Sequence, residues 1–535
     1  MHQRICPERT GRWLGSFCPQ MGAYGDAPST KTIYENLCNL WIKILSPISV
    51  FLLLVLNSCS VGPDYKVPSA EIPATYKELT PEDAVIAKAW KPAEPKDATK
   101  RGSWWEIYQD LELNNLEKQV NISNQNVIEA EANYRAAIAA VRQTRSGYYP
   151  TVNLAPSASY SGTSKNATNN PPLPSHNSHF DFNAPIEASY MLDVWGSVRR
   201  AVESSSATAQ STEALLESAR LTYQGQLAQD YFSLRGLDTE RELLTSTVED
   251  YEKDLSITQN LYNQGVSAKL DLYLAQTQLE TSKAQLADVS LQRSQLEHAI
   301  AILMGKAPTS LSLPEKTLDV LPPKIPIGIP SALLERRPDV ASAERQMAAA
   351  NALIGVATAG YYPTIELSGS GGFEAYHLAQ LFSWPSLAWS VGESLTQPIS
   401  NGGKTHAQVE EARANYDAAV ASYRQAILTA LQQVEDNLVA LKDLETEAGN
   451  QEKAVADAKK SVDILINEYK SGTTSYLNVL TEKITESTNE INATNVQIRR
   501  MVASVALIQA LGGGWDVSKL PTTHTVSVIP EVKNP

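Results

Sequence analysis

Few residues in this 535-residue sequence have the types and spacing that would support chemistry. His176 and His179 stand three positions apart, a spacing found in metal sites, but no thiolate or acidic support completes a ligand set, and His377 and Asp181 do not supply it. The sequence also lacks a glycine-rich phosphate loop and a convincing Ser-His-Asp arrangement. We therefore expect no catalytic residue, no metal site and no cofactor, and hence not an enzyme.

Covalent modification is indicated at Cys59. An apolar run over residues 44–56 follows Lys43, has the length of the central part of a secretory signal, and leads into Leu-Asn-Ser-Cys at 56–59. This ending resembles the lipobox of bacterial lipoproteins, whose cysteine is lipidated and becomes the new N-terminus, although Asn57 is unusual in that motif. By the same resemblance, Ser60 suits export to the cell outer membrane, so we expect a lipid anchor there.

Composition excludes several kinds of partner and site. The net charge is −14, and such acidity repels nucleic acid and anionic membrane surfaces at long range. All four cysteines lie at or before position 59, so the rest of the chain can hold neither a disulfide framework nor a thiolate metal site. We expect no nucleic-acid partner.

Most of the remaining chain is predicted to form two very long helical hairpins. Apolar residues recur at steps of three, four and seven from Leu227 to Leu255 and again from Leu279 to Leu303, which places an apolar seam along each helix. Asn263 and Gly265 lie between these seams and permit the left-handed residue that ends a helix. The pattern predicts one antiparallel hairpin over residues 197–305 and a second over residues 404–512, with its turn around Gly472.

Four shorter segments alternate apolar with small or polar residues, which predicts strands at about residues 151–161, 180–195, 364–376 and 386–399. Tyr-Tyr-Pro-Thr occurs at 148–151 and again at 361–364, so the chain is a duplication. Each half would supply two strands and one hairpin. The flanking aromatic residues are of the kind that border a membrane barrel.

These elements predict the following organisation of the chain: an N-terminal extension and lipoprotein signal peptide (1–58), a lipidated extended tether (59–102), a first repeat with equatorial helices (103–305), a connector (306–337), a second repeat (338–512) and a C-terminal tail (513–535).

This arrangement cannot close on itself. Four strands are too few for a barrel, and open sheet edges are not tolerated in lipid, so a homo-oligomer must complete the wall. A helix from Ser197 to Tyr262 would measure roughly 100 Å at 1.5 Å per residue, enough to cross a periplasm. The expected fold class is mainly α with a small membrane β-barrel that several copies complete.

The mature chain resembles the TolC-like outer-membrane efflux channels, in particular their lipid-anchored branch in tripartite pumps. The motifs that carry the resemblance, in this order, are Cys-Ser-Val-Gly-Pro-Asp-Tyr at 59–65, Trp104-Trp105, the two Tyr-Tyr-Pro-Thr segments, Arg-Arg-Pro-Asp at 336–339 with Ala343-Glu344, and Ser-Tyr-Leu-Asn-Val-Leu at 475–480. The resemblance implies a homotrimer with about twelve strands in one outer-membrane barrel and a periplasmic α-helical tunnel. It also implies a periplasmic adaptor (membrane fusion) protein and an inner-membrane RND-type pump as partners, besides outer-membrane lipid.

The hairpin turns would be the periplasmic tips of this tunnel. We expect six tip residues to contact the adaptor: Gly265, Val266, Ser267, Gly472, Thr473 and Thr474. Alignment with the family's gate motifs suggests that Asp271 and Tyr469 join neighbouring helix pairs across the closed mouth. Thr474, Asn478 and Thr481 replace charged gate residues of some relatives, so packing of Leu270 and Leu477 would contribute more to closure.

Two function classes remain open. The first is a passive exit duct for drugs or other small molecules, with a type I secretion duct as a variant. The second is a non-conducting trimeric coiled-coil protein of the envelope. The duplicated strand junctions favour the duct, because a simple coiled coil needs no duplicated barrel.

Overall fold

The computed structural model describes residues 60–69, 72–73, 75–78, 103–162, 178–323, 325 and 336–513. The chain divides into two units, Met1–Cys59 and Ser60–Pro535. The first unit lies outside the described residues, and with it the predicted signal segment and Cys59. The same is true of His176, most of the predicted tether and the tail after residue 513.

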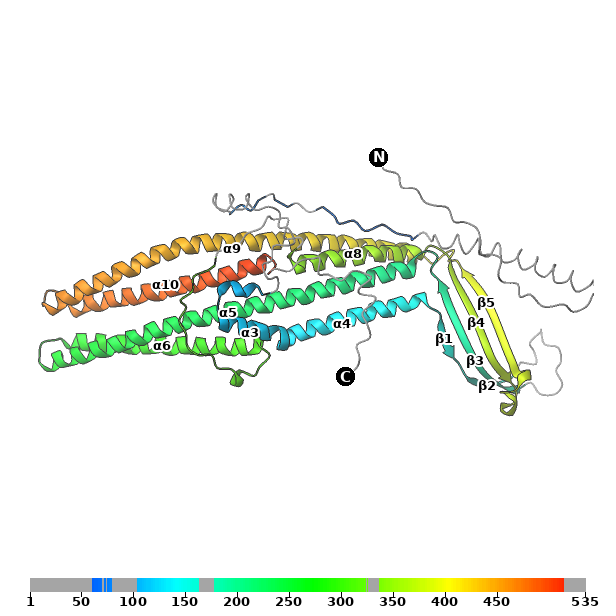
Figure 1. The fold of residues 1–535 in the computed structure, drawn as a ribbon, viewed down its shortest axis with the longest axis horizontal. Coiled ribbons are helices and arrows are strands. Elements are labelled where there is room, and N and C mark those ends of the chain that lie inside the picture. The colour runs from blue at the N-terminus through cyan, green and yellow to red at the C-terminus, as the bar shows by residue number, and fades with distance from the viewer. Residues whose placement is uncertain are drawn as a thin grey trace, which may run out of the picture. The chain divides into compact units, whose positions relative to one another are not determined.

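Two helical hairpins of equal length dominate the second unit (Figure 1). In the first hairpin, α5 (Ser197–Asn263) has 67 residues and α6 (Lys269–Leu303) has 35. In the second, α9 (Lys404–Lys470) and α10 (Tyr476–Ala510) have the same 67 and 35 residues. The apolar seams of the sequence become the contacts within each hairpin, since α5 packs on α6 and α9 on α10.

The remaining helices are shorter. A 3-10 turn, η1 (Trp104–Tyr108), leads into α3 (Leu111–Ser123), which Asp110 caps, and into α4 (Gln125–Arg145), which Asn124 caps. The 3-10 turns η2 (Ser146–Tyr148) and η3 (Pro308–Ser310) follow α4 and α6, and α8 (Pro338–Ala359) opens the second half. Among the described residues, no helix is both long and apolar enough to cross a membrane.

One antiparallel sheet joins the two halves. Its strands are β1 (Thr151–Leu154), β2 (Ser157–Gly162), β3 (Ser178–Leu192), β4 (Thr364–Ala375) and β5 (Leu387–Thr396), with η5 (Leu378–Gln380) and η6 (Trp384–Ser386) between the last two. Both β1 and β2 pair with β3, which pairs with β4, which pairs with β5. The edges of the sheet are therefore β1 with β2 on one side and β5 on the other.

The strand bounds differ from the sequence prediction in three places, of which the last is that β5 ends at Thr396 rather than at 399. The expected strand over residues 151–161 is divided at Ala155 and Pro156, although β1 and β2 keep one register on β3. Pro156 has no amide proton to donate to the ladder. The second strand ends at Leu192 rather than 195, because the Asp193 carboxylate accepts bonds of 2.9 Å from the amides of Val198 and Arg199 at the start of α5.

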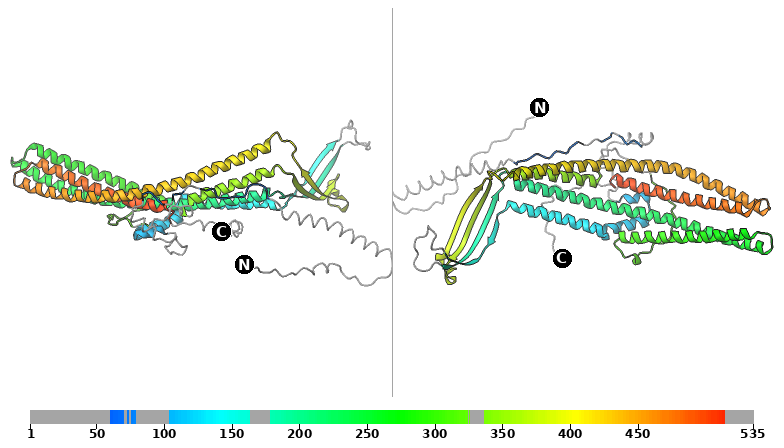
Figure 2. Two further views of the ribbon diagram at one scale, coloured as in Figure 1. Left: turned by 90° about the horizontal axis from the view of Figure 1, so that it is seen from above. Right: turned by 180° about the vertical axis from the view of Figure 1, so that it is seen from behind.

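Near the sheet, four helices form a layer in the order α4, α5, α8, α9 (Figure 2). α4 leads to β1, β3 leads to α5, α8 leads to β4, and β5 leads to α9, so all four helices meet the sheet at one end. Trp195 fixes this junction: its ring stacks on Tyr362 with centroids 4.7 Å apart, and its Nε1 donates to the carbonyl of Pro363 at 2.7 Å.

The segment that follows Cys59 is extended but is not a free tether where it is described. The amide of Val61 donates to the carbonyl of Trp195 at 3.2 Å, and the Asn351 side chain donates to the carbonyl of Pro63 at 3.1 Å. Gly62 has φ +100°, and a Cβ on it would lie 2.5 Å from the Cα of Gly355 on α8. The backbone therefore lies directly on the helical layer, a contact that only glycine allows here.

A buried ionic network fixes the connector after α6 to the middle of the first hairpin. Asp238 on α5, whose side chain is 1% exposed, accepts from Arg235 at 2.8 Å and from Arg293 on α6 at 2.6 Å. The same carboxylate accepts from the amide of Lys316 at 3.1 Å, while the two guanidinium groups donate to the carbonyls of Pro314 and Leu313. Every charge in this network thus has an opposite charge or a carbonyl beside it.

Candidate functional site

The turns of both hairpins have one geometry. In the first, the amides of Gly265 and Val266 donate to the carbonyls of Tyr262 and Leu261 at 3.0 and 2.9 Å. In the second, the amides of Gly472 and Thr473 donate to the carbonyls of Tyr469 and Glu468, both at 3.0 Å. Each is a Schellman motif, which requires a left-handed residue after the helix, and the two glycines have φ +75° and +78°.

These turns are open to solvent. A Cβ added to Gly265 or Gly472 would meet nothing within 4 Å, and Val266 is 73% exposed. Ser267, Thr473 and Thr474 make only local bonds: Ser267 Oγ donates to Asp271, Thr473 Oγ1 donates to the carbonyl of Glu468, and Thr474 Oγ1 accepts from Asn478. The six expected tip residues are therefore placed together at two accessible turns.

Just behind the turns, an aromatic cluster packs the two hairpins on each other. Its buried members are Tyr251, Ala275 and Leu279 from the first hairpin, and Tyr476 and Leu480 from the second. Tyr469 packs on the edge of this cluster, with its ring centroid 5.8 Å from that of Tyr476. Lys483 on α10 also forms an ion pair with Asp254 on α5. The hairpins of one chain therefore converge near their tips.

Asp271 and Tyr469 belong to these two neighbouring hairpins. The Asp271 carboxylate accepts a hydrogen bond of 2.9 Å from Ser267 in its own turn. Burial raises the pKa of Tyr469, and the negative charges of Asp271 and Asp254 raise it further. Among the described contacts no hydrogen bond joins the two side chains. The structure thus places both residues near the turns of adjacent hairpins without a direct bond between them.

Leu270 and Leu477 do not pack in the core of one chain. Leu270 is 64% exposed and Leu477 is 49% exposed. Asn478 and Thr481, which replace charged gate residues of some relatives, form only local hydrogen bonds. Asn478 donates to Thr474 just before α10, and Thr481 donates to the carbonyl of Leu477 within α10. Both side chains are uncharged, so neither can form an ion pair.

Sequence reasoning missed two features of this site. The pairing of Lys483 with Asp254 joins residues 229 positions apart, so no local pattern reveals it. Tyr251 and Tyr476 were visible as members of the apolar seam and of the 475–480 motif, but their mutual packing depends on how the hairpins meet. The signal in the sequence was that several tyrosines lie within about ten residues of each predicted turn, which indicates aromatic packing there.

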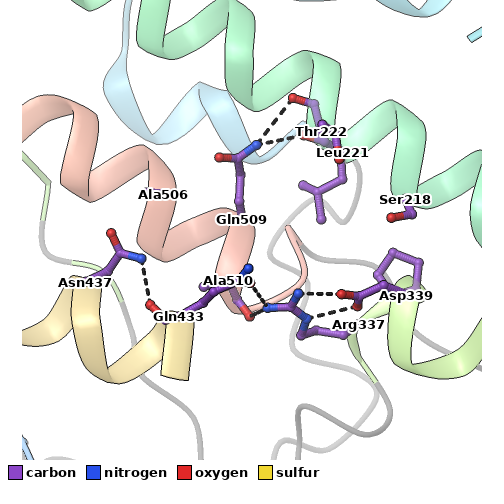
Figure 3. A pocket seen from close by; sticks show the side chains of 11 residues that line it. Ser218, Leu221, Thr222, Arg337, Asp339, Gln433, Asn437, Ala506, Gln509 and Ala510 are labelled. Atoms are coloured by element: carbon purple, nitrogen blue, oxygen red, sulfur yellow. Dashed lines mark hydrogen bonds and ion pairs between the residues drawn. The ribbon is translucent and has the colours of Figure 1, made fainter. Parts of the chain in front are cut away.

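A pocket lies far from the tips, around Arg337 (Figure 3). It measures about 400 Å³ and is lined by α5, α8, α9 and α10. The guanidinium donates to Gln433 at 2.8 Å and to the carbonyl of Ala510 at 3.1 Å, and it is paired with Asp339. Arg337 therefore joins the start of α8 to α9 and to the end of α10, which indicates a structural role. Within the described ranges, no group of three or more His, Cys, Asp or Glu residues could hold a metal ion.

Comparison with known proteins identifies relatives over most of the chain. The family model described as "Outer membrane efflux protein" matches residues 116–306 and 329–513. The solvent efflux pump outer membrane protein SrpC of Pseudomonas putida is 30% identical over 477 residues, which are 88% of this chain and 99% of SrpC. The cation efflux system protein CusC of Escherichia coli is 26% identical over 467 residues, or 86% of this chain and 97% of CusC.

Solved structures agree with this match. The outer-membrane channel OprN superposes with a TM-score of 0.75 at 29% identity, covering 85% of this chain and 100% of the OprN chain. The mainly helical fold with two long hairpins and a small sheet is therefore the fold of a known channel.

Proposed function

The chain belongs to the outer membrane efflux protein family and is the outer-membrane channel component of an efflux pump, and we propose that it works as a homotrimer. The resemblance to TolC-like channels, the fold class and the non-enzymatic function are thereby confirmed. Its periplasmic tunnel is built from the long hairpins. We propose that it passively conducts drugs or other small molecules which an inner-membrane RND-type pump and a periplasmic adaptor deliver.

One observation carries this proposal: both halves place a hairpin of equal length between an exposed turn and a shared sheet. A helix of 67 residues measures about 100 Å at 1.5 Å per residue, so the sheet and the turns are far apart. If three copies close their strands into one wall in the outer membrane, the turns lie deep in the periplasm. There they are within reach of an adaptor.

We propose that Cys59 is the lipid anchor. Ser60, the next residue, lies beside Gly196 at the junction between sheet and helices, with its Cα 3.1 Å from the position of a Cβ on Gly196. The apolar run over residues 44–56 and the Leu-Asn-Ser-Cys ending at 56–59 support the assignment. Cys59→Ser should abolish labelling of the protein by radioactive palmitate, and unchanged labelling would exclude this site.

We further propose that the tips contact the adaptor. Val266→Glu or Thr473→Glu should weaken adaptor binding about tenfold, since a charge would be buried at the centre of that interface. The trimer should persist. Adaptor cross-linking and export would measure the effect, and Asn450→Glu, on an exposed part of α9 about 30 Å from the turn at 1.5 Å per residue, is the matched control. Cross-links that map to residues 61–69 instead would contradict this placement.

Asp271 and Tyr469, with Leu270 and Leu477, are our proposed gate. Their position supports this proposal: Asp271 lies in the first turn of α6 and Tyr469 in the last turn of α9, and the two leucines remain exposed beside the same turns. Exposed apolar side chains at a site where helices of several copies converge can close a mouth by packing together.

A further inference from the structure

One carboxyl group lies in the core of the described chain without a polar partner. Four positions of α3 are buried at the spacing of a single helix face: Leu113, Leu116, Glu117 and Val120. Three of them are apolar, and the fourth, Glu117, is 0% exposed. Neither oxygen of its carboxyl group has a hydrogen-bond partner among the described residues. Since glutamate is almost never fully buried unless it is paired, this position requires an explanation.

Polar contacts hold α3 on α5 at its two ends. Arg235 donates to Glu112 at 2.7 Å near the start of α3, and Gln224 donates to Asn121 at 2.8 Å near its end. The two pairs run in opposite order along the chain, so α3 lies antiparallel to α5. Glu117 falls between these contacts, in the middle of the buried face.

The surroundings of Glu117 are apolar. The two end contacts place it level with Leu227 and Ala228 of α5, which are both fully buried. These residues belong to a core cluster that also contains Ile300 of α6 and Met501 of α10. An unpaired charge in this environment would be costly, because no water or opposite charge compensates for its burial.

Within the described ranges, no charged group offsets this burial. The titratable groups of α3 and of η1, α4 and α5, which pack against it, do not bond to Glu117. The nearest of these on α5 are Asp230, Tyr231 and Arg235. Those on η1, α3 and α4 include Glu106, Tyr108, Asp110, Glu112, Lys118 and Glu129. Burial therefore raises the pKa of Glu117 well above the ordinary value for a glutamate.

We propose that Glu117 makes α3 a proton-dependent clasp: α3 stays docked on α5 while the carboxyl group carries its proton, and it is released when the proton passes to solvent. α3 is suited to such a release because it has 13 residues, whereas α5 and α6 have 67 and 35. A short element can open locally, which exposes the carboxylate to water and leaves the long helices folded. This inference goes beyond the proposed channel function and does not depend on it.

The direction of the pH dependence follows from the raised pKa. Docked α3 keeps the proton of Glu117 over a pH range in which released α3 has already lost it. The stabilisation of the docked form is therefore complete at acid pH, below the ordinary pKa, and is lost as the pH rises through the raised value. Above that value, each further pH unit should increase the ratio of released to docked α3 about tenfold.

Release of α3 would act on the joint between the two hairpins. Leu113 and Val120 share their core cluster with α5 and α6 of the first hairpin and with α10 of the second. Just before α3, the hydroxyl of Tyr108 lies 2.8 Å from that of Ser504 on α10, and both side chains are buried. The clasp thus bridges both hairpins, and its opening would loosen the contact between them.

Hydrogen exchange measures the docking of α3 directly. Peptides that cover residues 111–123 should exchange at similar rates in the wild type and in Glu117→Gln at about pH 5, where glutamine has the shape of the protonated acid. At about pH 9 the wild type should exchange at least tenfold faster than Glu117→Gln, because glutamine does not titrate. Comparison of the two proteins at one pH cancels the intrinsic pH dependence of exchange.

Two further variants complete the design. Glu117→Leu makes the buried face entirely apolar, so it should keep α3 protected at both pH values and replaces Glu117→Gln if that variant does not fold. Glu129→Gln removes an exposed carboxylate from α4 and is the matched control. It should keep the pH dependence of the wild type.

Infrared spectroscopy gives a second readout, since a protonated carboxyl group has a C=O stretching band that a carboxylate lacks. Part of this band should persist in the wild type above the ordinary pKa of glutamate and be missing in Glu117→Gln.

Equal exchange in the wild type and both Glu117 variants at every pH would overturn the clasp. Slower exchange of the wild type than of Glu117→Gln at alkaline pH would also overturn it, because the carboxylate would then be ionised and paired. Neither result bears on conductance, so the proposed channel function would stand.

Discussion

At the scale of single residues, Asp271 and Tyr469 give the gate its sharpest test. Asp271→Ala with Tyr469→Phe removes the carboxylate and the phenol that we propose form a hydrogen bond between neighbouring helix pairs across the closed mouth of the trimer. The double variant should weaken closure, because a charge-assisted hydrogen bond is worth about 1.5–3 kcal/mol. Conductance of the closed channel and sensitivity of cells to large antibiotics should both rise.

The matched control for this variant is Tyr273→Phe, which removes a phenol from an exposed position two residues from Asp271. It should leave conductance unchanged. An unaltered closed conductance in the double variant would refute the assignment, whatever the control shows.

The turn residues were predictable because their reason is local. Glycine is the residue that adopts φ +75° at little cost, so Gly265 and Gly472 mark both turns in the sequence. The environment of Asp271 was less predictable. Asp271 accepts a hydrogen bond from Ser267 in its own turn, whereas its electrostatic effect on the pKa of Tyr469 depends on packing between residues nearly 200 positions apart.

At the scale of elements, the network around Asp238 explains how the connector is held to the first hairpin. Asp238→Asn should destabilise the protein by about 3–5 kcal/mol, because it leaves Arg235 and Arg293 buried with less opposite charge. Thermal unfolding of the purified protein would measure this loss. Asp250→Asn breaks an ion pair with Lys253 whose side chains are 60% and 69% exposed, and it should leave the midpoint almost unchanged. Equal shifts in the two variants would contradict the role assigned to the network.

Long periodic elements were predictable and contacts between distant segments were not. The apolar seams and the turns predicted the bounds of both hairpins to within a few residues, because heptad spacing sustained over that length is typical of long helices packed on each other. The break between β1 and β2 could have been read from Pro156. The docking of Val61–Gly62–Pro63 on α8 could not, because its cause is the close approach of Gly62 to Gly355, nearly 300 residues away.

At the scale of the whole molecule, the duplication supports the homotrimer that we propose. Inside the chain, α5 with α8 and β3 with β4 join the two halves, and in the homotrimer that we propose the outer elements would contact other copies. A head-to-tail contact of this kind closes into a ring rather than into a pair with two identical faces. Closure of helices and strands in one register would make a continuous wall from sheet to tips.

Ion conductance in a planar bilayer tests the central claim most directly. The purified trimer should insert and pass little current, and the variant Asp271→Ala with Tyr469→Phe should pass a larger, steady current through the same assembly. A protein of trimeric mass that passes no current, even with this variant, would contradict the duct and would instead describe a non-conducting coiled-coil protein of the envelope.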